Sequence, residues 1–216
     1  MNLNGNAEKY DVKNVLPLEN SPLNGKNILF LGSSVTYGWA AQGTSFADYI
    51  AKRNEATVIK EAVSGTTLVC GVNSYVKRLK NVDKTLKSDL FVCQLSTNDA
   101  TQNKPLSTVD DDNDETICGA INKIITYVTQ TFDCRVIFYT NAYYANENYA
   151  NMVNALYEIA NRRNIGVIDL YNAEKFNDIT PKLRKLYMAD EIHPTKAGYL
   201  EWWTPQIEKY LYKFIN

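Results

Sequence analysis

The chain has 216 residues, with 23 basic and 24 acidic side chains and a formal net charge of −1. This balance gives no basic surface for nucleic acid or for an anionic membrane, so neither is an expected partner. The length fits one domain with a substantial core.

No run of about 18 apolar residues predicts a transmembrane helix. Residues 1–27 lack the apolar stretch of a signal peptide, so we expect a cytoplasmic protein with mostly buried, reduced thiols. The chain has one histidine and scattered cysteines without the spacing of a zinc site, and we expect no metal or organic cofactor. The cysteines are Cys70, Cys93, Cys118 and Cys134. The sequence is compatible with a homo-oligomer.

Residues 1–26 are polar and rich in asparagine, and we predict an N-terminal arm or irregular lead-in there. From residue 27 onward strands and helices alternate, without a second boundary, so 27–216 is predicted to be a single domain. The predicted strands are 27–31, 57–63, 90–95, 135–140 and 166–170. The predicted helices are 45–53, 72–82, 115–131, 149–163, 180–187 and 196–214.

This alternation predicts an α/β fold: a three-layer α/β/α sandwich around a five-stranded parallel sheet. The common arrangement for five such strands is the flavodoxin-like order 2-1-3-4-5. The helix over 196–214 is expected to be capped by Thr195.

An acidic run, Asp110 to Glu115, precedes the helix predicted over 115–131. It suggests a cation site, but the glycine and the distal glutamate of a calcium loop are missing. We therefore interpret these acids as favourable charges at a helix N-terminus.

Polar residues follow the strands where ligands bind in an open α/β sheet, beyond the carboxyl ends. Ser34 follows the first strand, Gly65 the second and Asn98 the third, while Asp190 and His193 lie in the last loop after the fifth. Taken singly, each of these residues is more simply interpreted as structural. The predicted topology, however, brings all five to the same edge of the sheet, beyond the carboxyl ends of the strands.

These residue types fit acyl transfer. Ser34 would attack a carbonyl carbon, and His193 would accept its proton and return it to the leaving alcohol. Asp190 would fix the imidazole tautomer. The N–H groups of Ser34 and Gly65 and the amide of Asn98 would donate to the oxyanion.

The chain resembles the SGNH hydrolases, also called GDSL esterases/lipases. Their four blocks are a G-D-S-x-T-x-G turn, a glycine after the second strand, a G-x-N-D segment and a C-terminal D-x-x-H. In this sequence they are the segment 32–38, Gly65, the segment 96–99 and the segment 190–193. The resemblance spans about residues 27–200, and it implies a serine hydrolase with a flavodoxin-like fold.

Two positions depart from the family pattern. Ser33 stands where the family has Asp, and Ser96 stands where it has Gly. Because Val35, Thr36 and Gly38 follow in the family register, the resemblance assigns the nucleophile to Ser34 rather than to its neighbour.

Trp39, Tyr143 and Tyr144 lie in loops after strands, and we consider them candidates for a substrate pocket, although aromatic residues more often serve the core. Cys70 lies near Gly65, but it lacks a local base and is interpreted as a structural thiol.

The sequence predicts a serine esterase for small esters, either short-chain acyl esters or O-acetyl carbohydrates. A lysophospholipase or thioesterase is an alternative, and so is a non-catalytic binding domain of the same fold. A nucleotide-binding flavodoxin-like protein is disfavoured because the first turn lacks a phosphate-binding motif.

Overall fold

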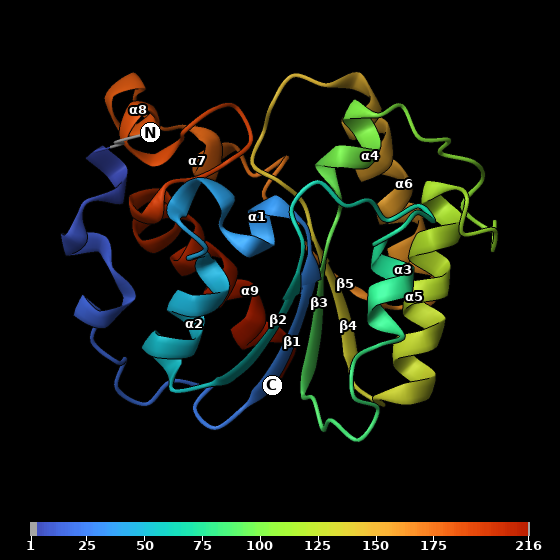
Figure 1. Ribbon diagram of the computed structural model, residues 1–216, viewed down its shortest axis with the longest axis horizontal. Coiled ribbons are helices and arrows are strands. Elements are labelled where there is room, and N and C mark those ends of the chain that lie inside the picture. Colours follow the sequence, from blue (N-terminus) through green and yellow to red (C-terminus); the bar gives the residue numbers. More distant parts are fainter. Residues whose placement is uncertain (1–3, 216) are drawn as a thin grey trace.

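A computed structural model describes residues 4–215 (Figure 1). Five parallel strands form one sheet in the order β2-β1-β3-β4-β5, which confirms the predicted fold class and strand order. The strands are β1 (Asn27–Gly32), β2 (Thr57–Ala62), β3 (Leu90–Gln94), β4 (Arg135–Tyr139) and β5 (Gly166–Ile168).

The longer helices lie where the sequence predicts them. They are α2 (Phe46–Asn54), α5 (Ile117–Thr131), α6 (Glu147–Arg163), α8 (Pro181–Tyr187) and α9 (Thr204–Ile215). The shorter α-helices are α1 (Ser34–Tyr37), α3 (Tyr75–Leu79), α4 (Thr97–Thr101) and α7 (Glu174–Asn177). Helix α3 is shorter than the predicted 72–82, because the N–H of Tyr75 donates to Thr67 O at 2.9 Å and the residues before it form a turn.

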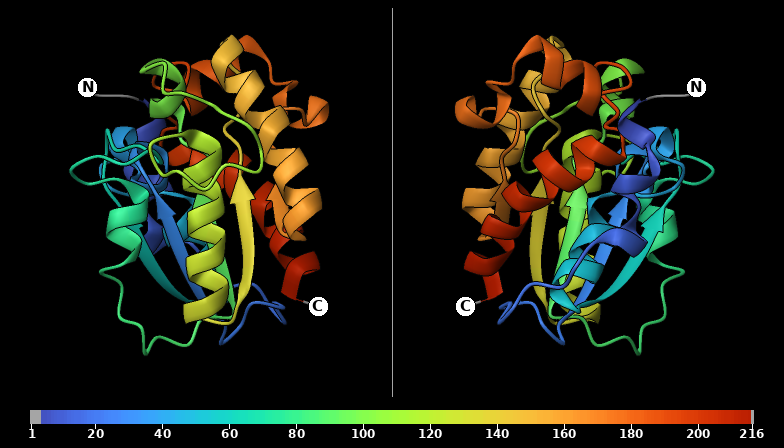
Figure 2. Two further views of the ribbon diagram at one scale, coloured as in Figure 1. Left: turned by 90° about the vertical axis from the view of Figure 1, so that its right-hand side faces the viewer. Right: turned by 90° about the vertical axis from the view of Figure 1, so that its left-hand side faces the viewer.

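The alternating side chains of each strand fill the two cores of the sandwich. In β1, Ile28 and Phe30 pack with α2 and α9, whereas Leu29 and Leu31 pack with α3, α5 and α6. Figures 1 and 2 show these two helix layers on opposite faces of the sheet. The carboxyl ends of the strands point to the end of the molecule where α1, α4 and α8 lie (Figure 1).

The N-terminal arm packs on the α2 side of the sandwich in short 3₁₀ turns, η1 (Asn4–Asn6), η2 (Glu8–Tyr10) and η3 (Val12–Asn14). Tyr10 and Leu23 are buried in the described structure, and the hydroxyl of Tyr49 on α2 donates to Tyr10 O at 2.6 Å. The arm therefore packs against the rest of the molecule through buried side chains and this hydrogen bond.

The last predicted helix is present, but a π-helical segment, η5 (Gly198–Trp203), interrupts it before α9. Thr195 caps it as expected, because its Oγ1 accepts a hydrogen bond from the N–H of Gly198 at 3.2 Å. The π-helical segment begins five residues after His193, close to the loop that carries the predicted catalytic residues.

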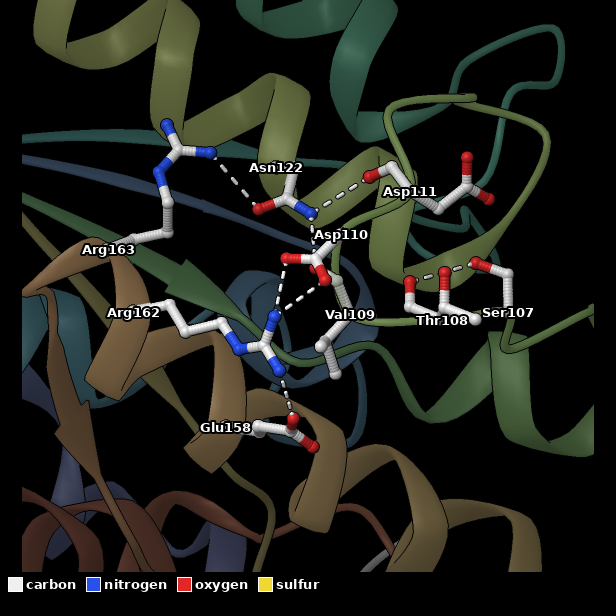
Figure 3. A network of polar contacts seen from close by, with 9 residues as sticks. All are labelled: Ser107, Thr108, Val109, Asp110, Asp111, Asn122, Glu158, Arg162 and Arg163. Carbon is white, nitrogen blue, oxygen red and sulfur yellow. Dashed lines mark hydrogen bonds and ion pairs between the residues drawn. The ribbon is translucent and has the colours of Figure 1, made fainter.

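The acidic run lies in a loop fastened to α5 and α6 (Figure 3). Arg162 on α6 donates to both carboxylate oxygens of Asp110 at 2.6 Å, and Asn122 on α5 donates to the carbonyls of Val109 and Asp111. Among residues 4–215, no group of three or more His, Cys, Asp or Glu side chains is arranged to hold a metal ion. Within the acidic run, the carboxylate of Asp110 thus fastens the loop to α6.

No helix within the described range 4–215 is long and apolar enough to cross a membrane. The cysteines form no disulfide, and Cys93 and Cys118 are buried. Cys70 and Cys134 are partly exposed, so the expectation of mostly buried thiols holds for half of them.

Candidate active site

The structure brings Ser34, His193 and Asp190 into one hydrogen-bonded row. Ser34 Oγ lies 2.8 Å from His193 Nε2, and His193 Nδ1 lies 2.8 Å from Asp190 Oδ2. With Nδ1 as the donor to the carboxylate, Nε2 is left to accept the serine hydrogen. Ser34 and His193 are 159 positions apart in the chain, and the topology of the sheet brings them together.

Asp190 is held as a carboxylate by its own loop. Its Oδ1 accepts the N–H groups of Ile192 at 2.8 Å and His193 at 2.7 Å. Partial burial raises the pKa of Asp190, but the hydrogen bonds from Ile192 and from the ring and backbone of His193 outweigh burial and lower the pKa below its usual value. A charged Asp190 is the form that orients and stabilises an imidazolium.

The turn between β1 and α1 presents Ser34 and buries Ser33. Gly32 is required there, because a Cβ on this residue would collide with Thr36 Oγ1. Ser33 is fully buried, and its N–H and hydroxyl face Gln94 Oε1 at 2.9 and 3.3 Å. Only the second serine therefore points toward His193.

Gly65 occupies the turn after β2 with a φ of +79°, a left-handed conformation that favours glycine. A Cβ on this residue would meet no other protein atom within 4 Å, so within the protein it is the backbone conformation that favours glycine.

Asn98 lies in α4, and its amide nitrogen donates to Thr66 O at 2.9 Å, next to the Gly65 turn. Ser96, the departure from the family glycine, caps α4 by accepting the N–H of Asp99. The role of this serine is thus to start the helix that carries Asn98.

Asp99 fastens the loop after β2 to α4. It is fully buried, and its carboxylate accepts the N–H groups of Leu68 at 2.7 Å and Val69 at 3.0 Å. Burial raises the pKa of Asp99, against the lowering effect of these hydrogen bonds. Its contacts position the segments around Gly65 and Asn98 relative to each other.

The loop that carries His193 is anchored on both sides. The hydroxyl of Tyr199 in η5 donates to Val35 O at 2.7 Å, which ties this region to the residue after Ser34. Lys196 forms a 2.6 Å ion pair with Asp11 of the arm, and its N–H donates to Asn6 Oδ1 at 2.9 Å. The arm thus holds the histidine loop, a contact that no sequence pattern indicated.

The predicted pocket aromatics separate into different environments. Trp39, in the short turn η4 (Trp39–Ala41), is 53% exposed, and its ring centroid lies 5.0 Å from that of His193. Tyr143 is 50% exposed and packs against Tyr171 at 5.2 Å between centroids. Tyr144 is instead buried in the core against Tyr149, so its ring does not reach the surface.

Besides Tyr199, two further residues that support the site were not predicted. Gln94 ends β3 with its Oε1 facing Ser33 and Thr36, and Arg78 on α3 donates to Gly32 O at 2.7 Å. The sequence does contain an indication for Gln94, because a glutamine at the end of an otherwise apolar strand is unusual. An arginine on a short helix gives no comparable signal, because most such side chains are solvated.

A cavity of about 460 Å³ lies away from these residues, beside α3, α5 and α6. Apolar side chains including Leu79 and Ile124 line it, together with polar residues, of which Asp110, Asn122 and Arg162 are labelled in Figure 3. None of the predicted site residues lines this cavity, so it does not extend the row of Ser34, His193 and Asp190.

The sequence model of the GDSL-like lipase/acylhydrolase family matches residues 30–200. A search among curated protein sequences finds no match.

Solved structures share the fold at low sequence identity. A lipase/acylhydrolase from Enterococcus faecalis is 21% identical with a TM-score of 0.61, covering 87% of this chain and 96% of its own. A protein from Bacteroides ovatus, provisionally assigned as a GDSL-like lipase, is 18% identical with a TM-score of 0.65, covering 88% and 99%. A Lactobacillus plantarum protein reaches a TM-score of 0.75 at 17% identity, covering 89% and 97%.

Proposed function

The chain belongs to the GDSL-like lipase/acylhydrolase family and is thus a hydrolase of ester substrates, and from this premise we propose that it is a serine esterase with Ser34 as its nucleophile. The observation that carries the proposal is the continuous hydrogen-bonded row from Ser34 through His193 to Asp190. Such a row removes the serine proton as the bond to the acyl carbon forms.

In the first step Ser34 Oγ attacks the ester carbonyl while His193 Nε2 takes its proton. The imidazolium then protonates the leaving alcohol, and an acyl-enzyme remains on Ser34. Water activated by the same imidazole hydrolyses that acyl group in a second step. Asp190 keeps the imidazole in the required tautomer and balances its charge.

The tetrahedral intermediate carries a negative oxygen that needs donors. We assign these to the backbone N–H groups of Ser34 and Gly65 and to the side-chain amide of Asn98. The amide nitrogen of Asn98 has two hydrogens, and the bond to Thr66 O uses one. The second hydrogen remains for the oxyanion, so this assignment does not require the contact with Thr66 to break.

For the substrate we propose a small ester, with a short acyl group or an O-acetyl group on a carbohydrate. Trp39 supports this choice, because its exposed indole beside His193 offers a flat apolar face to the alcohol side of the substrate. The C–H face of a pyranose packs well on such a surface. The cavity of about 460 Å³ beside α3, α5 and α6 lies apart from Ser34, so it is not a binding place for the acyl group of that serine.

Labelling with a fluorophosphonate tests the nucleophile. We expect an adduct on Ser34 in the wild type and none in Ser34→Ala, with strongly slowed labelling in His193→Ala because the base is lost. A wild-type protein that stays unlabelled and hydrolyses no ester would favour the binding-domain alternative. An adduct on another residue would contradict the assignment of Ser34.

A panel of substrates tests the ester class. Acetyl, butyryl and octanoyl esters of one alcohol compare acyl lengths, and acetylated sugars compare alcohols. We expect kcat/KM to fall from acetyl to octanoyl and to be highest for the acetylated sugars. A preference for octanoyl esters, lysophospholipids or acyl thioesters would support the alternative acylhydrolase.

A further inference from the structure

Arg78 is a buried cation whose hydrogen-bonding capacity is fully used. It lies on α3, only 7% exposed, and its five guanidinium hydrogens have acceptors on four residues. Nε donates to Asn73 O at 3.0 Å, and Nη1 donates to Glu61 O at 3.0 Å and Glu61 Oε1 at 2.9 Å. Because the side chain is buried and each of its N–H groups has an acceptor, the guanidinium of Arg78 is held in one position and orientation.

The remaining nitrogen, Nη2, joins two parts of the proposed active site. It donates to Gly32 O at 2.7 Å and to Thr66 Oγ1 at 3.1 Å. Gly32 precedes the nucleophile turn, and Thr66 follows Gly65. One nitrogen atom therefore bridges the turn that presents Ser34 and the turn that presents the Gly65 N–H.

Both ends of this bridge continue toward the oxyanion donors. The peptide group between Gly32 and Ser33 is held at its carbonyl by Arg78 and at its N–H by Gln94 Oε1 at 2.9 Å. Thr66, in turn, accepts the amide of Asn98 at its carbonyl. Arg78 is thus linked to all the segments that carry the assigned oxyanion donors.

We propose that Arg78 is a positioning residue that sets the separation of the Ser34 and Gly65 turns and so shapes the oxyanion site. This inference rests on the proposed function, and it adds a residue that the four sequence blocks do not contain. Donors that stabilise a transition state act only when fixed in place, and a displacement of about 1 Å can cost about 10²-fold in rate. The loss of Arg78 should therefore affect kcat more than KM.

Arg78→Lys is the sharpest variant, because it keeps the charge and loses the planar fork. One ammonium cannot serve Gly32, Thr66, Glu61 and Asn73 together. We expect kcat to fall by roughly 10- to 100-fold with KM within about threefold. A boronic acid, which forms a tetrahedral adduct with the serine, should bind more weakly by a similar factor.

Arg53→Lys is the matched control. Arg53, on α2 in the other helix layer, also donates to a carboxylate, that of the buried Glu208, from Nε and Nη2 at 2.9 and 3.1 Å. We expect this variant to lose thermal stability but keep the wild-type kcat and boronate affinity. Kinetics are compared at a temperature where circular dichroism shows both variants folded.

Thr66→Val provides a second test should Arg78→Lys fail to fold. It removes one acceptor of Nη2 with almost no change in shape, and we expect a smaller loss of kcat in the same direction. Equal kcat and equal boronate affinity in wild type and Arg78→Lys, or in wild type and Thr66→Val if Arg78→Lys does not fold, would overturn the inference and leave the proposed function standing. A wild type without esterase activity or labelling would overturn both.

Discussion

At the scale of single residues, the adjacent serines show how one turn gives two identical side chains different roles. Ser34 Oγ is directed to His193, while the hydroxyl of Ser33 is buried against Gln94 Oε1, which also faces the N–H of Ser33 and the hydroxyl of Thr36. The hydroxyl of Ser33 is thus one of several donors to the same oxygen. Its removal leaves the turn fastened.

We therefore expect Ser34→Ala to lower kcat by at least about 10⁴-fold, whereas Ser33→Ala keeps most of the activity. Initial rates with p-nitrophenyl acetate and the fluorophosphonate labelling yield measure the difference. Each variant serves as the control for the other, because both remove one hydroxyl from the same turn. The reverse ranking would mean that the nucleophile is Ser33.

Asn98→Ala tests the oxyanion assignment by kinetics. We expect a loss of about 10²–10³-fold in kcat, the usual effect of removing one oxyanion donor. Thr101→Ala is a suitable control, because this residue lies on the same short helix with its hydroxyl bonded only to the carbonyls of that helix. An unchanged kcat in Asn98→Ala would leave this residue as a structural contact to Thr66.

Much of the candidate site could be predicted from the polar residues and glycine that follow the strands, because the carboxyl ends of parallel strands lie at the same edge of the sheet. The contacts of Arg78, Gln94 and Tyr199 were not predictable in this way. Their partners are backbone atoms or residues up to 164 positions away, and no local pattern encodes such pairings. The burial of Tyr144 likewise depends on its packing against Tyr149 of α6, which the neighbouring sequence does not determine.

At the scale of elements, strands and long helices were predictable because their periodicity repeats several times. Helices α1 and α4 are too short to show a period, and they carry Ser34 and Asn98. The π-helical segment η5 was also missed, since its residues read as an ordinary helix. The short elements that follow the strands are thus the least predictable from sequence, and they carry part of the candidate site.

The loop before α5 allows a test of an element by pH. The pKa of Asp111 is lowered to about 2 by the N–H of Asn113, with further contributions from Ser107 and Thr116, which caps α5. A folded-state pKa below the ordinary 3.8 means that the ionised group stabilises the fold above about pH 4 and that this contribution is lost as pH falls toward 2.

We therefore expect Asp111→Asn to lower Tm near neutral pH and to approach the wild type as pH falls toward 2. Thermal unfolding at a series of pH values measures the two curves. Asp112→Asn makes the same charge change one residue away and controls for net charge. A Tm difference that stays constant from pH 7 to pH 2 would show that ionisation of Asp111 does not fasten the loop.

At the scale of the whole molecule, the proposed site is assembled from opposite ends of the chain. The order β2-β1-β3-β4-β5 places β1 inside the sheet, and η5 returns the C-terminal region to the segment after β1 through the bond from Tyr199 to Val35. The N-terminal arm then covers the outside of this junction. Three distant stretches thus meet around the loop that carries His193.

Asn6 is the contact through which the arm reaches both sides of the site. Its Oδ1 accepts the N–H of Lys196 at 2.9 Å, and its Nδ2 donates to Ala40 O at 2.7 Å. Lys196 follows His193 by three positions, and Ala40 is adjacent to Trp39. One carboxamide therefore joins the histidine loop to the turn that carries the exposed indole.

We expect Asn6→Ala to lower Tm, because two hydrogen bonds worth roughly 0.5–1.5 kcal/mol each are lost together. It should also lower kcat/KM several-fold, since the histidine loop and the Trp39 turn are no longer held to each other. Asn14→Ala is the matched control. Asn14 lies in the same arm, and its side chain donates to a backbone carbonyl within the arm, that of Glu8 at 2.8 Å, rather than to the histidine loop. Equal kcat/KM in the two variants would mean that the arm stabilises the fold without positioning the site, whereas a loss confined to Asn6→Ala supports a direct role of the arm in holding His193.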